Sequence, residues 1–407
     1  MPSTVTFPGV FVEETGSGIH PIEGVPTSTT AFVGWARKGP RHKPTKILTF
    51  ADYERIFGGL WRFSTMSYAV RHFFLNGGSE ALIVRVASAK ARDGLSRDLE
   101  DATELLNGDA KKMIGLQSLK KAASFNLLCI PPLLLGSSPG TTREADVPRS
   151  TWRTAARLCR DRRAFLLIDA PRNWTAVTAV SRVETFRTIA RENGAIYFPR
   201  LRLADPLQEN KLANFAPCGA VAGIISRIDA ASGVWKAPAG LEASASGVTG
   251  LSIAVTEAEN EALNPLGINC LRSFAGSAAV VVWGARTLTG KDTSITEWKY
   301  IPVRRTALYI EESLDRGTQW VVFEPNGEPL WAQIRLNVGV FMDKLFRQGA
   351  FQGRTPNEAY FVKCDQTTTT QDDINAGVVN IVVGFAPLKP AEFVVIKLQQ
   401  LAGQAAT

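Results

Sequence analysis

The three histidines are the first residues to test for catalytic chemistry, because imidazole is the commonest general base near neutral pH. They are His20, His42 and His72, and all stand in the first fifth of the chain. His20 lies in a stretch rich in Gly, Pro, Ser and Thr, and His42 lies in a basic loop. The chain contains no G-x-S-x-G nucleophile elbow. We therefore expect no catalytic residue in this protein.

A Gly-Lys pair in "WGARTLTGKDT" (283–293) is the best candidate for nucleotide binding. A phosphate-binding P-loop needs four residues between its glycines and a Ser or Thr directly after the Lys. Here five residues separate Gly284 from Gly290, and Asp292 follows Lys291. An aspartate at that position would repel a phosphate. The sequence predicts a polar loop after a core strand, and no cofactor.

Acidic pairs and cysteines supply no clear metal site. Neighbouring carboxylates point to different faces of a strand or helix, and the three pairs are Glu13–Glu14, Glu311–Glu312 and Asp372–Asp373. The cysteines are odd in number, widely spaced and free of any C-x-x-C motif, so we expect buried free thiols in a reducing compartment. They are Cys129, Cys159, Cys218, Cys270 and Cys364.

Length and composition are those of a globular protein of two or three domains. The chain has 407 residues, of which 45% are hydrophobic and 21% charged. The net charge of +8 is dispersed over small clusters without interleaved aromatics, which argues against a nucleic-acid partner. Neither a signal peptide nor an apolar run of about 18 residues is visible. We expect synthesis in the cytoplasm and no insertion into a membrane.

The pattern of elements changes twice along the chain. Residues 1–30 form an extended arm, and the order strand, helix, helix, strand follows up to residue 90. A polar stretch at 88–124 predicts a boundary. Strands then alternate with helices to residue 250, which predicts βαβ units and a mostly parallel sheet. The last third, 250–400, favours an α+β domain with helices on one face of a largely antiparallel sheet. The predicted helices span 49–59, 67–78, 148–162, 175–194, 216–233, 304–317 and 329–350.

One short strand near the N-terminus has no local partner. The segment "FPGVFVEE" (7–14) contains the apolar run Val10, Phe11, Val12, and no tight turn or second strand follows it. Unpaired backbone groups on such a strand are a template for pairing with another chain. The segment therefore raises the question of which strand it joins.

The helix predicted at 329–350 has two different faces. Its apolar residues follow the 3.6-residue period and are Trp331, Ile334, Val338, Phe341, Met342 and Leu345. Lys344 and Arg347 stand on the opposite face, either as solvated cations or as a basic surface for an acidic partner. Arg304 and Arg305 open the preceding helix and oppose its macrodipole. Their position predicts carboxylates against them, from this chain or another.

Long motifs at both ends of the sequence resemble contractile tail sheath proteins. The C-terminal ones are "LNPLGINCLRSFAGSAAVVVWGARTL", "EWKYIPVRRTALYIEESLDRGTQWVVFEPNGEPLW" and "AYFVKCDQTTTTQDDINAGVVNIVVGFAPLKPAEFVVIKL". "FPGVFVEE", "PIEGVPTSTTAFVGWARKGP", "FADYERIFGG" and "FFLNGG" are similar to the family's opening pattern. The family covers phage tails, R-type bacteriocins and extracellular contractile injection particles.

The resemblance implies a mixed α/β and α+β fold. A sheath core built from N- and C-terminal parts, with helices on one face of its sheet, would carry an inserted middle α/β domain. The division that we predict is listed here: an N-terminal arm at 1–28, core parts at 29–90 and 251–390, an outward-facing middle domain at 91–250, and a C-terminal donor strand at 391–407.

The resemblance also implies roles for particular residues. The two arms would add strands to the sheets of neighbouring subunits. The donor-strand candidates are Val10, Phe11, Val12, Glu13, Phe393, Val394, Val395 and Ile396, with a hinge at Gly16 and Gly18. The candidates for contact with an inner tube are Lys344, Arg347, Arg304 and Arg305.

By the same resemblance, the protein is a structural subunit with no catalytic, cofactor or metal site. Its partners would be further copies of itself in stacked six-fold rings, an inner tube protein, and baseplate and terminator proteins. Assembly in the bacterial cytoplasm would yield a virion tail or a released particle, whose contraction drives the tube through a membrane. Two alternatives remain open: an α/β enzyme with a nucleotide or acyl substrate, and another tail or baseplate component.

Overall fold

A computed structural model describes residues 20–88, 95–96, 98–136, 143–274, 279–290 and 297–392. The chain divides into two compact units. The larger unit, which we call the body, comprises residues 25–312 and 387–407. The smaller, which we call the terminal unit, comprises residues 1–24 and 313–386. Each is described by itself below.

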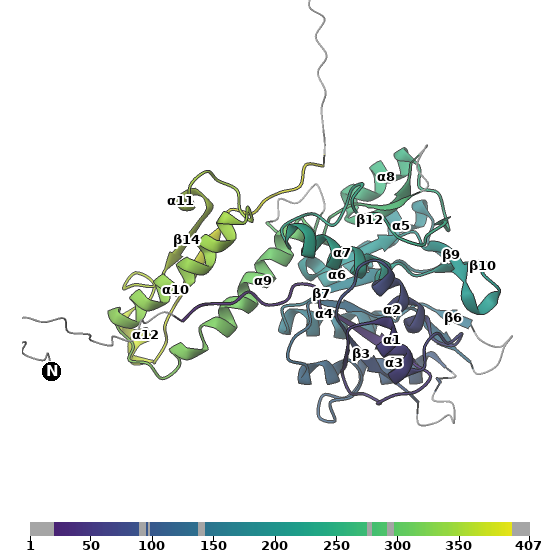
Figure 1. The fold of residues 1–407 in the computed structure, drawn as a ribbon, viewed down its shortest axis with the longest axis horizontal. Helices are drawn as coiled ribbons and strands as arrows, with labels where there is room; N and C mark the ends of the chain where they lie inside the picture. Colours follow the sequence, from purple (N-terminus) through teal and green to yellow (C-terminus); the bar gives the residue numbers. More distant parts are fainter. Residues whose placement is uncertain are drawn as a thin grey trace, which may run out of the picture. The chain divides into compact units, whose positions relative to one another are not determined.

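The body is built on an eight-stranded sheet with the order β13-β12-β8-β7-β4-β1-β3-β2 (Figure 1). Its six inner strands are parallel, and β2 and β13 at the two edges run antiparallel. The strands are β1 (Thr30–Gly34), β2 (Thr45–Ile47), β3 (Ala81–Arg85), β4 (Leu127–Cys129), β7 (Phe165–Asp169), β8 (Gly194–Phe198), β12 (Ile268–Ser273) and β13 (Val280–Trp283).

Helices cover both faces of this sheet, as an inner parallel sheet requires. Neighbouring residues of a strand enter opposite cores: Ala31 and Val33 pack on one side and Phe32 on the other. The first core takes α3 (Leu99–Asn107), α4 (Arg149–Asp161), α5 (Ala176–Arg182), α6 (Glu184–Ala190) and α8 (Glu257–Leu263). The second takes α1 (Phe50–Phe57), α2 (Thr65–Leu75) and α7 (Cys218–Ser232), together with the start of α9 (Ile301–Gly317).

Close packing of α2 and α7 depends on two glycines. A Cβ added at Gly219 would lie 2.1 Å from the carbonyl oxygen of Ala69, and one at Gly223 would lie 2.3 Å from that of Phe73. The two backbones therefore approach as only glycine allows. Smaller sheets complete the body: β5 (Leu133–Leu135) pairs with β6 (Arg143–Ala145), and β9 (Leu201–Asp205) pairs with β10 (Lys211–Phe215) and β11 (Gly250–Leu251).

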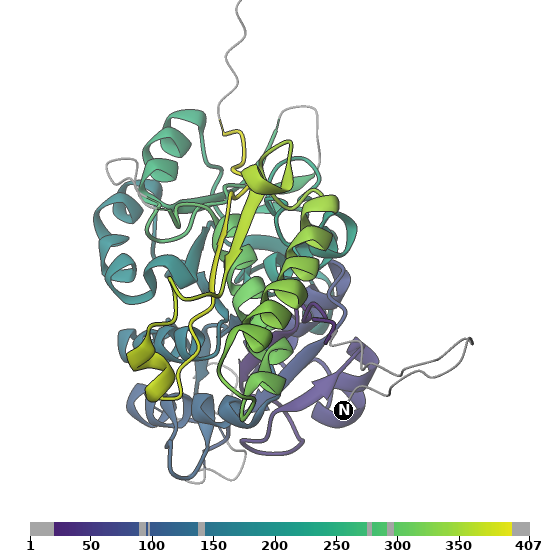
Figure 2. The ribbon, with the colours of Figure 1, turned by 90° about the vertical axis from the view of Figure 1, so that its left-hand side faces the viewer.

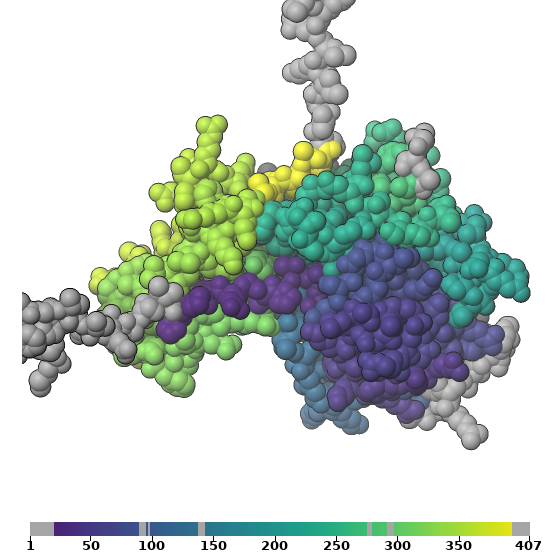
Figure 3. Space-filling view, viewed as in Figure 1, coloured from purple at the N-terminus to yellow at the C-terminus, as the bar shows by residue number. Residues whose placement is uncertain are grey.

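The terminal unit contains the end of α9, the long helix α10 and a two-stranded sheet (Figure 2). Its elements are α10 (Glu328–Arg347), α11 (Pro356–Ala359), β14 (Tyr360–Lys363), α12 (Gln371–Asn375) and β15 (Val382–Phe385). In Figure 3 the described start of the chain, drawn in purple, lies against this unit, where the His20 ring stacks on Trp320 with 4.2 Å between centroids. Within the described ranges no helix is long and apolar enough to cross a bilayer.

Several sequence predictions are confirmed. The mixed α/β fold class is one of them, and all five cysteines are buried free thiols. The helix predicted at 49–59 is α1, which Thr49 caps by accepting a hydrogen bond from the Asp52 N–H. The six apolar residues predicted for the 329–350 helix are all buried in α10. The helix predicted at 175–194 breaks into α5 and α6 near Val183.

The pairing of strands differs from the expectation in two ways. The last third does not form one antiparallel sheet, because β12 and β13 join the large sheet while β14 and β15 pair separately. Period-2 patterning cannot say which strands pair. In addition, β1 pairs with β4, so the large sheet continues across the boundary predicted after residue 90. The five-part division of the chain stays a prediction.

Candidate strand-addition site

The β14–β15 sheet is the candidate site for strand addition, because it has only two strands. The strands pair antiparallel, with Phe361 opposite Gly384 and Lys363 opposite Val382. The Ala386 N–H extends the ladder by donating to the Ala359 carbonyl at 2.8 Å. An isolated two-stranded sheet is marginally stable in water. This sheet therefore depends on what covers and extends it.

Both long edges of the sheet offer backbone hydrogen bonds. In an antiparallel pair, bonded and non-bonded residue pairs alternate, and the Ala359–Ala386 bond fixes which is which. Phe361 and Lys363 consequently face β15. Tyr360 and Val362 turn their N–H and C=O groups outward on the β14 edge, as do Val383 and Phe385 on the β15 edge. In the described parts of the chain, no residue bonds to these outward groups.

The two faces of the sheet differ. On the covered face, the Phe351 ring packs against Tyr360 and Phe385, with centroids 6.2 and 5.5 Å apart. On the open face, Phe361 is 49% exposed and Val382 43% exposed. The Phe361 ring lies so close to Gly384 that a Cβ there would meet it at 2.2 Å. An aromatic ring thus shields a strand glycine, and the open face presents an apolar surface.

An open groove of about 770 Å³ runs between α10 and the β14 edge. Its walls include Tyr360 and the helix residues Leu336, Gly339 and Val340. Leu336 is 51% exposed and Val340 55% exposed, although α10 buries another apolar stripe. A strand added to β14 would place side chains over these residues. The groove can therefore cover one face of an incoming strand.

Lys344 and Arg347 line this same groove. Arg347 pairs with Asp343 one helical turn earlier, at 2.7 Å, and its side chain is 78% exposed. Burial and the carboxylate of Asp343 raise the pKa of the neighbouring Tyr360. Both cations are accessible to a partner, so their predicted contact with a tube stays a prediction.

Arg304 and Arg305 meet carboxylates of their own chain. Arg305 is buried, donates to both carboxylate oxygens of Asp229 at 2.9 and 2.6 Å, and reaches the Thr27 carbonyl at 2.9 Å. Arg304 bonds to Asn193 and Glu311 and lies over the Trp298 ring. The prediction of carboxylates against this pair is confirmed. Arg305 is buried in its ion pair with Asp229. The predicted contact of Arg304 and Arg305 with a tube stays a prediction.

The described roots of the two arms are held in different units. In the terminal unit, the His20 N–H donates to Asn337 at 2.9 Å. In the body, the Glu392 carboxylate accepts from Arg286 Nε at 2.8 Å and Nη2 at 2.6 Å, and from the Tyr300 hydroxyl at 3.1 Å. Arg286 is fully buried. All ten predicted donor and hinge residues lie outside the described ranges: Val10, Phe11, Val12, Glu13, Gly16, Gly18, Phe393, Val394, Val395 and Ile396.

Sequence reasoning missed the groove and the Arg286 anchor. Leu336 and Val340 stand four residues apart with Gly339 beside them, a second apolar stripe that could have been found. Arg286 lies in the loop that we examined only as a failed P-loop. Nothing in its local spacing indicates a partner at Glu392.

Comparisons with known proteins identify the family of this chain. Profiles described as the phage tail sheath protein central domain and the phage tail sheath C-terminal domain match residues 135–288 and 293–400. The tail sheath protein of Vibrio phage KVP40 is 25% identical over 181 residues, which span 44% of this chain but only a quarter of that protein.

Two solved structures match over nearly the whole chain. The sheath complex of the extracellular contractile injection system PVC, in its contracted state, is 26% identical with a TM-score of 0.75, covering 98% of both chains. The contracted helical sheath of the anti-feeding prophage is 28% identical with a TM-score of 0.72, covering 98% of this chain and all of the other. This class of protein is structural. The chain belongs to the contractile tail sheath protein family and is a subunit of a contractile sheath.

Proposed function

We propose that this subunit polymerises helically around an inner tube by strand addition. The N-terminal and C-terminal arms of neighbouring copies would pair with the two outward edges of β14–β15. One observation carries the proposal: a two-stranded sheet with outward backbone groups on both edges and a groove beside one of them. The sheet has two edges with outward backbone groups, one for each of the two arms. Because a donated strand makes a head-to-tail contact, it propagates as a helix instead of closing a dimer.

The partners follow from this arrangement and from the family. Six-fold rings of the chain would stack around a tube protein, start on a baseplate and end at a terminator. New contacts between subunits in the shortened state would supply the free energy of contraction, which drives the tube through a membrane. The particle would be assembled in the bacterial cytoplasm as a virion tail or as a released contractile particle.

Proline substitutions at the two edges test the proposal. Val362→Pro removes an outward N–H from the β14 edge, and Val383→Pro removes one from the β15 edge. Neither N–H takes part in the β14–β15 ladder, so we expect a folded protein that forms no striated tubes by electron microscopy. Val382→Thr, on the open face, keeps every backbone donor and serves as the control that assembles. Normal tubes from both proline variants would refute strand addition at this sheet.

Truncation tests the arms separately from the fold. Deleting residues 1–19 or 393–407 retains the roots at His20 and Glu392, which hold the arms to the chain's own units. We expect soluble, folded subunits by circular dichroism and no tubes from either deletion. Tubes of wild-type length from a truncated chain would show that the arm in question is not shared.

A further inference from the structure

Helix α4 carries four arginines on its exposed side. They are Arg149, Arg153, Arg157 and Arg160, and each of them is exposed. Because residues three and four apart share one side of a helix, the four side chains form a continuous row, which we call the arginine ridge. The opposite side of α4 is buried in the first core of the body. The packing of the helix behind it therefore fixes the ridge in place.

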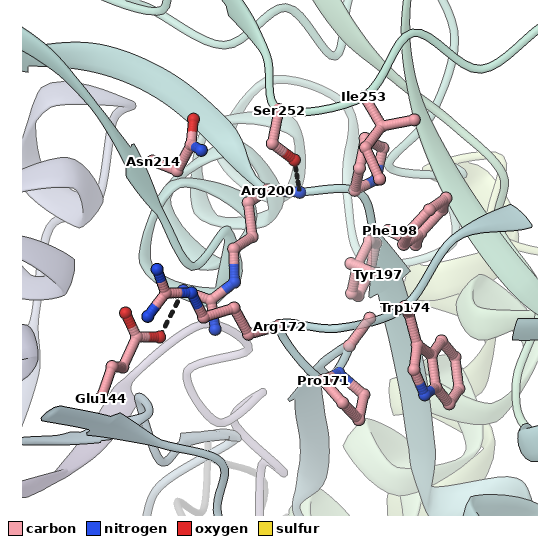
Figure 4. Close-up of a pocket in the computed structure, with 12 residues that line it drawn as sticks. Glu144, Pro171, Arg172, Trp174, Tyr197, Phe198, Arg200, Asn214, Ser252 and Ile253 are labelled. Atoms are coloured by element: carbon pink, nitrogen blue, oxygen red, sulfur yellow. Dashed lines mark hydrogen bonds and ion pairs between the residues drawn. The ribbon is translucent and has the colours of Figure 1, made fainter. Parts of the chain in front are cut away.

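Other arginines of the body meet carboxylates of their own chain. Figure 4 shows Arg200 paired with Glu144 where β7 and β8 end. Arg286 pairs with Glu392 at 2.6 Å. Within the described ranges, by contrast, no guanidinium group of the arginine ridge makes a hydrogen bond or an ion pair. The ridge thus differs from these arginines in lacking a carboxylate partner in the described part of its own chain.

Acidic residues close to the ridge leave it unpaired. Asp161 is the one acid in α4, and α3, which packs against α4, exposes Glu100 and Glu104. None of these three carboxylates forms an ion pair with a described residue. Like charges four residues apart destabilise a helix, and Arg149 opposes the macrodipole in the first turn. The ridge therefore costs the isolated subunit stability, which an acidic partner would offset.

Helix α8 has the complementary charge. Its sequence EAENEAL carries three glutamates and no cation. Glu257 and Glu261 are exposed and stand four residues apart on one side of the helix, whereas Glu259 is used in capping the helix start. Neither Glu257 nor Glu261 forms an ion pair with a residue of the described ranges. Glu257 suits the helix N-terminus, but Glu261 lies beyond the first turn and is not explained in that way.

The two helices occupy different places in the body. Figure 1 shows α8 at the top of the body and α4 below it. Helix α8 packs against α5 and β12, whereas α4 packs against α3, α6 and β7. Two complementary patches at different places on one chain can join each copy to the next in an open series. This is the kind of contact that a sheath subunit requires.

We propose that the arginine ridge binds Glu257 and Glu261 of a second copy in the sheath. Arginine and carboxylate pair through two parallel N–H donors, which fixes their orientation as well as their distance. The two glutamates have the same four-residue spacing as Arg153 and Arg157, so two helices laid alongside each other align the pairs. The contact joins one body to the next and uses neither arm, so it adds to the proposed strand addition without depending on it.

Charge reversal on the ridge of the full-length chain tests the proposal. Arg153→Glu combined with Arg157→Glu should give subunits that fold, by circular dichroism, because both side chains are exposed. We expect the yield of tubes in electron micrographs to fall by about tenfold or more, since close charge pairs across an interface contribute at least that factor to affinity. Lys111→Glu combined with Lys112→Glu makes the same change of charge at exposed positions of the body, and it is the matched control that assembles.

Reversal on α8 should cause the same loss, and the two reversals should compensate each other between copies. Glu257→Lys combined with Glu261→Lys is expected to form few tubes alone. In an equimolar mixture with the reversed ridge variant, each chain offers the charge that the other lacks, so tubes should form at a yield close to wild type. No recovery in the mixture overturns the proposal, and so does wild-type yield from either reversed variant alone.

Binding to heparin distinguishes a second copy of this chain from a different polyanion. If the reversed ridge variant loses heparin binding while it forms tubes at wild-type yield, the ridge binds a polyanion and the proposal is wrong. The proline variants of β14 and β15 test strand addition, and no change of charge on α4 or α8 should restore their tubes. The two proposals can therefore fail independently.

Discussion

Apolar strands need cover on their faces and partners on their edges, and the large sheet of the body and the β14–β15 pair differ in how far their own chain supplies these. Every residue of β1, β3, β7 and β8 is buried, and helices cover both faces of that sheet. No residue of β14 or β15 is buried. Helices of the same chain cover the first sheet, whereas the second has outward backbone groups on both edges and an exposed apolar face. If strands add to the second sheet as we propose, stability and assembly depend on different parts of the molecule.

The largest expected effect is on the body, from the buried ion pair of Arg305 and Asp229. Arg305→Ala leaves a buried carboxylate without its partner, and we expect the free energy of unfolding to fall by about 3–5 kcal/mol. Urea denaturation followed by tryptophan fluorescence measures it. Arg347→Ala removes an exposed pair in the terminal unit and should cost about 0.5 kcal/mol or less. Equal losses of unfolding free energy in the two variants would contradict the expected difference between the body and the terminal unit.

Two buried groups in the body should give it opposite responses to pH. Burial raises the pKa of Asp169 to about 6 and lowers the pKa of His72 to about 4. The folded protein takes up the Asp169 proton before the unfolded chain does, so this group adds stability as pH falls from 6 towards its ordinary value near 4. For His72 the unfolded chain is protonated first, and stability falls as pH drops from about 6.5 to about 4.

Single variants separate these two contributions, each worth about 3 kcal/mol over its full range. Asp169→Asn should lose stability as pH is lowered from 6.5 to 4.5, because only the histidine contribution remains. His72→Phe should gain stability over the same range. Unfolding free energies measured across this range check both slopes, and parallel curves for the two variants would contradict the assignment.

Phe361→Ala addresses the open face of β14. The side chain is half exposed, so its loss should lower the unfolding free energy by only about 1 kcal/mol. Tube yield should fall far more, because a strand added to the edge loses its aromatic neighbour and Gly384 loses its cover. Phe361→Tyr keeps the ring and should assemble. If the tube yield falls no more than the small loss of stability accounts for, the open face is not an assembly surface.

A modest effect on stability is expected from Lys344→Glu combined with Arg347→Glu, since both side chains are exposed in the last turn of α10. The change breaks the Arg347–Asp343 pair and places two carboxylates at the helix C-terminus, so the unfolding free energy should fall by about 1 kcal/mol. If these cations meet an acidic tube, the double variant forms tube-free sheath polymers but no tube-filled particles. Loss of both kinds of polymer would instead place the two residues in the strand-addition groove.

The sequence predicted local structure well where pattern and caps agree. The α10 stripe, the helix at 49–59 and the βαβ order all follow from period and turn chemistry. What it could not predict was pairing over long distances. Nothing in β12 and β13 indicates that they join β8 in one sheet, because a strand's pattern reports burial and not the identity of its neighbour.

The candidate sites also depend on contacts between residues far apart in the sequence, which the sequence did not predict. Lys344 and Arg347 were found from the faces of one helix, and the groove beside them needs β14 as well. Arg286 and Glu392 are 106 residues apart, and only folding brings the two charges together.

The chain crosses between its two units three times, at 24–25, 312–313 and 386–387. In a sheath joined by shared arms, tension from one neighbour enters the terminal unit near His20 and leaves the body near Glu392. Three covalent connections carry that tension in parallel, so cleavage of one by a protease leaves two intact. The mechanical strength of the sheath wall is then limited by the added strands themselves, where hydrogen bonds and not covalent bonds complete the path.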